Sequence, residues 1–163
     1  LLGPPPGAWR IGGVVSAEAR EGVWENGRWT GPVSARLEAG TLDSADGLIR
    51  LRGVQASVDW SDPVSGTSER DQRLTLDSGE VQGLALGPAA AVFQLASWDR
   101  IELASASVET LGGSLSLQPA TLLPASGAFS VRAAFRRIDL ARVSALLPLG
   151  GSTATGAADG EIE

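Results

Sequence analysis

Few side chains in this sequence could carry out chemistry. The 163 residues include no His, Cys or Met, and all 13 basic residues are arginines. Without Cys and His there are no ligands for the usual zinc, iron–sulfur or haem sites. A thiol nucleophile and a Ser–His–Asp triad are excluded as well. We therefore expect no enzyme activity, no cofactor and no metal site.

Two pairs of carboxylates deserve comparison with a calcium site. Asp43 and Asp46 lie three residues apart, as do Asp59 and Asp62. Calcium needs six to eight oxygen ligands, and neither pair is followed by the glycine and glutamate of an EF-hand loop. Aspartate also accepts hydrogen bonds from its own backbone in turns. We interpret both pairs as turn residues, with calcium as the minor alternative.

Tryptophan stands next to a carboxylate in Trp24-Glu25, Asp59-Trp60 and Trp98-Asp99. A glycosidase needs two carboxylates around the scissile bond. Neighbours on a strand point to opposite faces, however, so we expect an inward Trp beside an outward acid. A row of exposed Trp rings would instead favour a carbohydrate-binding module.

Gly112-Gly113 precedes a predicted strand and not a helix, which argues against a nucleotide phosphate loop.

The charge of the chain argues against polyanionic partners. Thirteen basic and nineteen acidic residues give a net charge of −6 and a pI near 4.7. Nucleic-acid binding requires a basic surface. Electrostatic binding to anionic lipid headgroups requires a cluster of basic residues as well. No apolar run reaches the roughly 18 residues that span a bilayer. The sequence begins at Leu1, so we expect a piece of a longer protein whose membrane anchor lies elsewhere.

Hydrophobic residues alternate with a period of two along most of the chain. This pattern, interrupted by turn residues every eight to twelve positions, predicts a mostly β, antiparallel fold. The fold would be an elongated twisted sheet or groove, or alternatively a closed β-sandwich. We expect one β-rich module over residues 8–163, after a Pro-rich linker at 1–7. Strands are predicted at 9–15, 33–39, 48–60, 73–78, 80–86, 91–95, 100–108, 113–117 and 127–136, with a turn at 41–47 and a loop at 61–71.

Three local elements have sharper signals. Asn26-Gly27 between two Trp-bearing arms predicts a hairpin over 23–30 with a type I′ turn. The apolar parity changes after Gly53, which predicts a β-bulge there. Apolar residues at helical spacing predict a short helix over 139–147, with Asp139 as the N-cap. The helix would stop at Pro148-Leu149-Gly150, before a strand that begins near Glu161.

The strands have one apolar and one polar face. Period two would place the apolar residues either in a closed core or along an open groove for acyl chains, and periodicity alone does not separate the two. Arg136-Arg137 is interpreted as a solvated strand end, with a lipid phosphate or a carboxylate as the alternative partner. The predicted groove or core residues are Ile49, Leu51, Val54, Val58, Trp60, Leu115, Leu117, Phe129, Val131 and Phe135.

The last third of the chain carries a recognisable series of motifs. Residues 98–117 read WDRIELASASVETLGGSLSL, and 138–143 read IDLARV before a returning TGAADGEI at 155–162. This order of strand, LGG turn, strand, a further strand at 129–136, short helix and strand resembles the AsmA-like superfamily of bacterial envelope proteins. The YdbH type is the branch it is most similar to.

The resemblance implies a non-enzymatic segment of a lipid-carrying protein. Members of the family are anchored in the inner membrane and extend a β-rich groove through the periplasm toward the outer membrane. The implied cargo is phospholipid, and an outer-membrane lipoprotein is an implied partner. The C-terminal region of this branch also carries an older label, dicarboxylate transport. A permease of that kind needs membrane-spanning segments, which this sequence lacks.

Overall fold

The computed structural model describes residues 9–124, 128–146 and 154–162. The predicted linker 1–7 lies outside them. The elements in these residues are β1 (Trp9–Ala19), β2 (Val23–Glu25), β3 (Arg28–Thr30), β4 (Val33–Ser44), β5 (Ile49–Asp62), β6 (Thr67–Ser68), β7 (Gln72–Leu76), β8 (Ser78–Val81), β9 (Leu84–Ser97), β10 (Arg100–Thr110), β11 (Gly113–Leu117), β12 (Ala120–Leu123), β13 (Ala128–Phe129), β14 (Ala133–Asp139), α1 (Leu140–Leu146) and β15 (Ala157–Ile162).

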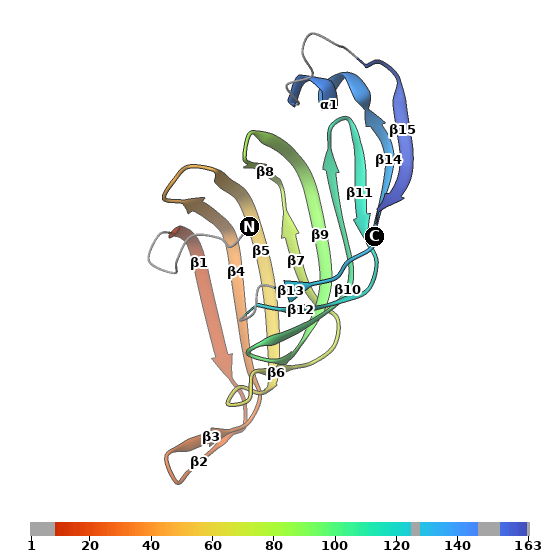
Figure 1. Cartoon of the computed structure of the whole chain (residues 1–163). Coiled ribbons are helices and arrows are strands. Elements are labelled where there is room, and N and C mark those ends of the chain that lie inside the picture. Colours follow the sequence, from red (N-terminus) through yellow and green to blue (C-terminus); the bar gives the residue numbers. More distant parts are fainter. Residues whose placement is uncertain (1–8, 125–127, 147–153, 163) are drawn as a thin grey trace.

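Nearly all the strands belong to one antiparallel sheet. Within the described residues it has 13 strands, and its main path runs β1-β4-β5-β7-β9-β10-β11-β14-β15. Half of the neighbouring pairs on this path are consecutive in the sequence, as short connections favour. The path ends at β1 on one side and at β15 on the other (Figure 1). The prediction of a mostly β, antiparallel fold is confirmed, in its open-sheet form.

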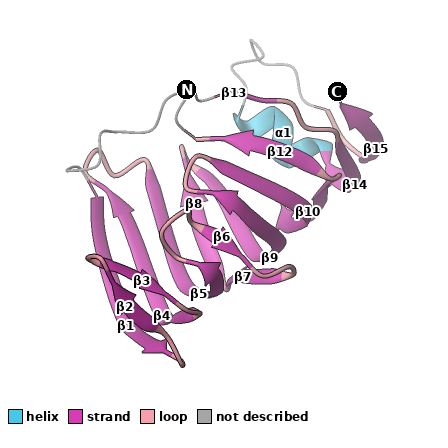
Figure 2. Ribbon diagram, turned by 90° about the horizontal axis from the view of Figure 1, so that it is seen from below, coloured by secondary structure: helices cyan, strands magenta, loops and turns pink. Residues whose placement is uncertain are grey.

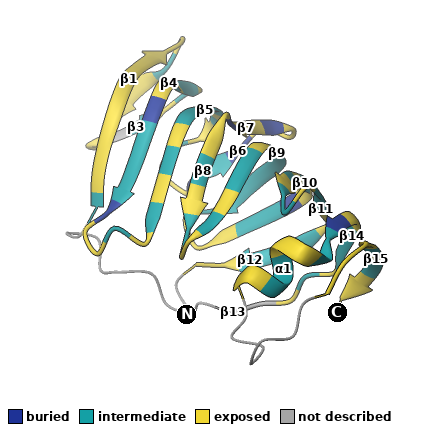
Figure 3. Ribbon diagram, turned by 90° about the horizontal axis from the view of Figure 1, so that it is seen from above, coloured by how far each residue is buried: buried dark blue, intermediate teal, exposed yellow. Residues whose placement is uncertain are grey.

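The sheet is bent, and its two faces are covered differently. Seen from below, the strands from β1 to β15 form an arc (Figure 2). β12, β13 and α1 all lie on the concave side of this arc, and the view from above shows the same arrangement (Figure 3). β12 continues the sheet beside β10 and also pairs with β13. The chain therefore folds partly across its own concave side.

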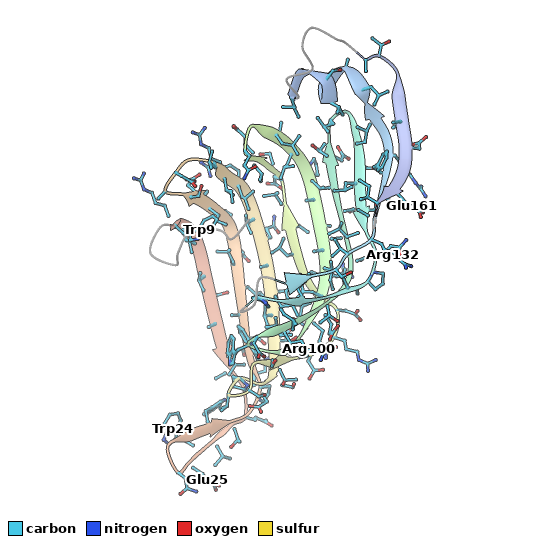
Figure 4. The ribbon with its side chains drawn as sticks, in the orientation of Figure 1. Trp9, Trp24, Glu25, Arg100, Arg132 and Glu161 are labelled. Carbon is cyan, nitrogen blue, oxygen red and sulfur yellow. The ribbon has the colours of Figure 1, made fainter. Side chains whose placement is uncertain are left out.

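The predicted hairpin over 23–30 is confirmed. β2 and β3 form a separate two-stranded sheet in which Trp24 lies opposite Trp29. Asn26 and Gly27 have φ values of 51° and 75°, as a type I′ turn requires at both central residues. Figure 4 shows Trp24 and Glu25 on this hairpin, beyond the lower end of the large sheet.

The predicted bulge at Gly53 is confirmed as well. Gly53 has a φ of 66° and no partner in β4, because Arg52 pairs with Thr41 and Val54 pairs with Gly40. β4 contains a matching irregularity, where the register shifts on both sides of Gly40 and Ala39 has a φ of 48°. Each extra residue restores the apolar side chains of its strand to one face.

Several predicted boundaries are wrong. The turn placed at 41–47 is mostly strand, since β4 runs through Ser44 and only the residues after it turn. The loop at 61–71 contains β6 and the end of β5. The strand at 80–86 is interrupted at Gln82 and Gly83, which turn with φ values of 52° and 82° between β8 and β9. Polar residues at strand ends led to these errors.

The predicted single strand at 127–136 is also wrong. β13 pairs with β12, and β14 pairs with β11 and β15, with a break between them. No strand was predicted at β12.

The short helix is confirmed as α1, and its N-cap is Asp139, whose Oδ1 accepts a hydrogen bond from the Ala141 amide at 2.9 Å. The predicted helix stop at 148–150 lies outside the described residues.

The turn between β4 and β5 offers a test of local geometry. Hydrogen bonds lower the pKa of Asp46, chiefly one from the Ser44 hydroxyl and then one from the Leu48 amide. A carboxylate with a lowered pKa stabilises the fold above its ordinary pKa, and this contribution is lost as the pH falls through the folded value. We expect Ser44→Ala to raise the pKa of Asp46 toward its ordinary value in an NMR titration.

Glu102 supplies the internal control for that titration. The pKa of Glu102 is lowered by hydrogen bonds from the Thr121 hydroxyl and from Arg100, far from the β4–β5 turn. Its pKa should therefore be the same in Ser44→Ala and in the parent chain. An Asp46 pKa that does not respond to the loss of the hydroxyl would contradict the hydrogen bond.

Candidate functional site

The cross-strand register places apolar residues beside apolar residues over the whole sheet. In β4 and β5, Val33 lies opposite Trp60 and Ala35 opposite Val58. Directly opposite residues of an antiparallel pair share one face, so these rows can be followed from strand to strand. Rows of the same face are Ile11–Leu42–Leu51, Ala56–Leu74–Ala91–Ala106–Leu117–Ala133–Ile162, Leu103–Phe93 and Val108–Leu115–Phe135. We call this the apolar face.

The other side of the sheet carries polar and charged side chains. Arg36 lies opposite Ser57, which lies opposite Arg73. This side carries ion pairs, among them Arg52 of β5 with Asp43 of β4 at 2.7 Å and, within β10, Arg100 with Glu102 at 2.6 Å. These pairs are largely exposed, so each is worth at most about 1 kcal/mol. The sheet is therefore amphipathic, with charge confined to one side.

We infer from the burial of its side chains that the apolar face is on the concave side of the sheet. Side chains crowd together on the inside of a bend and spread apart on its outside. In β5 the alternate apolar residues are half-buried, whereas Arg50, Arg52 and Asp59 are exposed. Figure 3 shows this banding along the strands. The buried apolar residues Leu76, Leu103 and Ile138 all belong to the apolar face.

No second layer covers the apolar face over most of its area. Within the described residues only three hydrophobic side chains, those of Leu76, Leu103 and Ile138, are buried. Most of the others are half-exposed, and at the β1 edge Ile11 and Val15 are 70% and 71% exposed. A closed sandwich of this length would bury far more of its apolar side chains. The face is an open, curved apolar surface.

The predicted site residues occupy two parts of this surface. β5 contributes Ile49, Leu51, Val54, Val58 and Trp60, which share one face across the Gly53 bulge. β11 contributes Leu115 and Leu117, and Phe135 of β14 lies opposite Leu115. Phe129 lies on β13 opposite Leu122, and Val131 is in the connection to β14.

The two groups are joined by residues that the sequence analysis did not select. Leu74 of β7, Phe93 and Leu95 of β9, and Ile101 and Leu103 of β10 fill the apolar face between β5 and β11. All of them show period-two alternation within their own strands. The alternation could have identified each one, but only the strand order shows that they lie between the two groups.

Aromatic rings close the lower end of the apolar face. The rings of Trp60 and Trp98 are 5.9 Å apart between centroids and tilted by 38°. Trp98 packs over Gly66, and its indole N–H donates to the Val64 carbonyl at 3.3 Å. A sugar-binding platform needs exposed, flat ring faces in a row. The expected inward Trp is wrong for Trp24 and Trp98, which are 69% and 62% exposed, and of the three only Trp60 is half-buried. The exposed rings do not form a row, because Trp24 lies on the separate β2–β3 hairpin and Trp98 is tilted against Trp60.

The paired carboxylates serve the fold. Asp43 binds Arg52, and Asp59 accepts a hydrogen bond from Ser34 at 2.6 Å. Asp62 accepts hydrogen bonds from Val64 and Ser65 in the following turn. Among the residues that the structure describes, no group of three or more Asp, Glu, His or Cys side chains could hold a metal ion.

The structure thus presents a continuous open apolar surface on one side of a single bent sheet. The chain belongs to the YdbH-like family, which is described as intermembrane phospholipid transport protein YdbH and matches residues 1–162. No curated protein and no solved structure matches the chain. The described part of the chain has no helix long and apolar enough to cross a membrane.

The family assignment confirms the resemblance found in the last third of the sequence and extends it over almost the whole chain. It supports a role in phospholipid transport and, since such transport runs between membranes, a place in the cell envelope.

Proposed function

We propose that this chain is a non-enzymatic segment of a periplasmic phospholipid carrier, and that the apolar face shields acyl chains. The observation that supports this proposal most is the continuity of the face. Apolar pairs follow one another across β1, β4, β5, β7, β9, β10, β11, β14 and β15, with no second layer above most of them.

The dimensions and energetics of the surface suit acyl chains. β9 alone has 14 residues, which corresponds to about 45 Å of strand at about 3.3 Å per residue. One leaflet of a bilayer supplies about half of a hydrocarbon core roughly 30 Å thick. Each CH₂ group removed from water contributes about 0.8 kcal/mol. An apolar surface can therefore hold a lipid without any charged residue that recognises it.

The proposal includes two contacts of the carrier, which the family resemblance suggests. Anchoring to the inner membrane would come from a part of the protein outside this segment. An outer-membrane lipoprotein would receive the cargo at the far end of the route. The proposed lipid-facing residues are Ile49, Leu51, Val54, Val58, Trp60, Leu115, Leu117, Phe129, Val131 and Phe135, together with Leu74, Phe93, Leu95, Ile101 and Leu103 between them.

Native mass spectrometry after bacterial expression, with lipid extraction of the same sample, tests the proposal. We expect phospholipid to be retained by the purified chain and identified in the extract. A chain that is folded but carries no lipid, and takes up none from phospholipid vesicles, would contradict it. Intrinsic Trp fluorescence separates the sugar-binding alternative, because added glycans should leave the spectrum unchanged while lipid removal should alter the environment of Trp60.

A further inference from the structure

A hollow of about 740 Å³ lies among residues of β9, β10, β11, β14 and α1. These elements come together at the upper end of the sheet (Figure 1). The hollow is lined by Ala85, Leu86, Gly87, Glu109, Thr110, Leu111, Gly112, Gly113, Ser114, Arg136, Arg137 and Arg142. We propose that this hollow binds the phosphate group of a phospholipid whose acyl chains lie on the apolar face. The proposal rests on the proposed function and adds a specific site for the polar end of the cargo.

The charge of the hollow is opposite to that of the chain. Its lining contains Arg136, Arg137 and Arg142 and a single acidic residue, Glu109, although the whole chain has a net charge of −6. Arg142 lies 3.7 Å from Asp139, in an exposed ion pair. Within the described residues the guanidinium groups of Arg136 and Arg137 have no ion pair. Arginine is well suited to phosphate because it can donate two parallel hydrogen bonds.

Local backbone geometry holds Arg142 beside the turn between β10 and β11. Leu111 and Gly112, with φ values of 52° and 76°, form the turn between β10 and β11. The Leu111 carbonyl accepts a hydrogen bond from the Asp139 amide at 2.9 Å. Asp139 then caps α1, which carries Arg142 to within 3.6 Å of the position that a Cβ on Gly112 would occupy. The turn and the first turn of α1 therefore form one unit.

The position of the hollow favours a lipid over a free phosphate. Glu109, Ser114 and Arg136 form a row on the polar side of the sheet. Leu86, Thr110 and Gly113 form the adjacent row, which belongs to the apolar face. The hollow is lined by both rows, so it extends around the upper end of the strands. A molecule bound there could place a phosphate near the arginines and its hydrocarbon on the apolar face.

Calorimetry with short-chain probes tests the site. The probes are dihexanoylphosphatidic acid, dihexanoylglycerol, which lacks the phosphate, and glycerol 3-phosphate, which lacks the acyl chains. The test variant is Arg136→Gln/Arg142→Gln. The matched control is Arg36→Gln/Arg73→Gln, which removes the same charge from exposed residues of the polar face. We expect the test variant to bind phosphatidic acid about tenfold more weakly and the control to stay within about twofold.

The remaining probes separate the possible results. Dihexanoylglycerol should bind both variants as it binds the parent, and glycerol 3-phosphate should bind far more weakly than phosphatidic acid. Equal losses in the test and control variants would overturn the site, since only net charge would matter. Equal affinity for glycerol 3-phosphate and phosphatidic acid would overturn the assignment to lipid. Failure of dihexanoylglycerol to bind any variant would instead contradict the acyl-chain surface, whatever the arginines do.

Discussion

Leu117→Asp is expected to reduce the phospholipid that co-purifies with the chain by about tenfold or more while the sheet stays folded. Leu117 lies between Ala106 of β10 and Ala133 of β14, so it is the largest side chain of its immediate row. A carboxylate there would remove the equivalent of two or more CH₂ contacts, each worth about 0.8 kcal/mol, and about 1.4 kcal/mol is a tenfold change in binding. Lipid extraction and native mass spectrometry measure the loss.

The fold should tolerate this change because the surface is open. Leu117 is half-buried and not enclosed, so water can solvate the new carboxylate, whereas a carboxylate in a closed core would be left without it. The matched control is Ser116→Asp, which adds the same charge at the next residue, exposed on the polar side. If both variants lose lipid equally, or if both keep it, the assignment of the apolar face as the lipid surface fails.

Alternation of polar and apolar residues was sufficient to predict the class of fold and much of the site. In β5 the apolar residues on both sides of Gly53 were assigned to one face, because a change of parity at a glycine is typical of a bulge. The Asn26-Gly27 turn was equally clear, since few residue pairs tolerate positive φ at both positions. Both features depend on the φ preferences of a few neighbouring residues, so a short stretch of sequence is enough to predict them.

Other bulges gave no such signal. The parity of β4 shifts at Ala39 and that of β14 at Arg137, which have φ values of 48° and 54°. Neither residue is a glycine, so positive φ was not expected there. The neighbouring strands impose it, since apolar side chains on either side of the bulge must reach the same face. Register between distant strands cannot be read from one strand.

The hollow at the upper end depends on contacts of the same kind. Arg136-Arg137 was interpreted as a solvated strand end, with a lipid phosphate or a carboxylate as the alternative partner. Gly112-Gly113 was interpreted as a turn that does not form a nucleotide phosphate loop. Arg142 was predicted only as one residue of the short helix over 139–147. The sequence contains no sign that α1 returns over the β10–β11 turn, because the hydrogen bond from Asp139 to Leu111 joins residues that are 28 positions apart.

Gly113→Ala is expected to destabilise the fold by about 3 kcal/mol or more, through overpacking against backbone. The bulge at Arg137 brings the β14 backbone onto β11, so a Cβ on Gly113 would lie 2.2 Å from the Arg136 carbonyl oxygen and 2.6 Å from the Arg137 carbonyl. Backbone atoms held in a sheet cannot move aside as a flexible side chain can. A loss of this size in a chain of 163 residues should lower the Tm by about 6–12 °C.

Gly83→Ala isolates the clash from the general cost of replacing a glycine. Gly83 has a φ of 82°, and a Cβ there would meet no atom within 4 Å. Alanine should therefore lower the free energy of unfolding only by about 1–2 kcal/mol, the cost of a left-handed conformation. Hydrogen exchange adds a second measurement. Gly113→Ala should accelerate exchange of the amides that join β11 to β14, because the two strands must separate, while Gly83→Ala should leave them protected. Equal Tm values and equal protection in the two variants would contradict the close approach of β14 to Gly113.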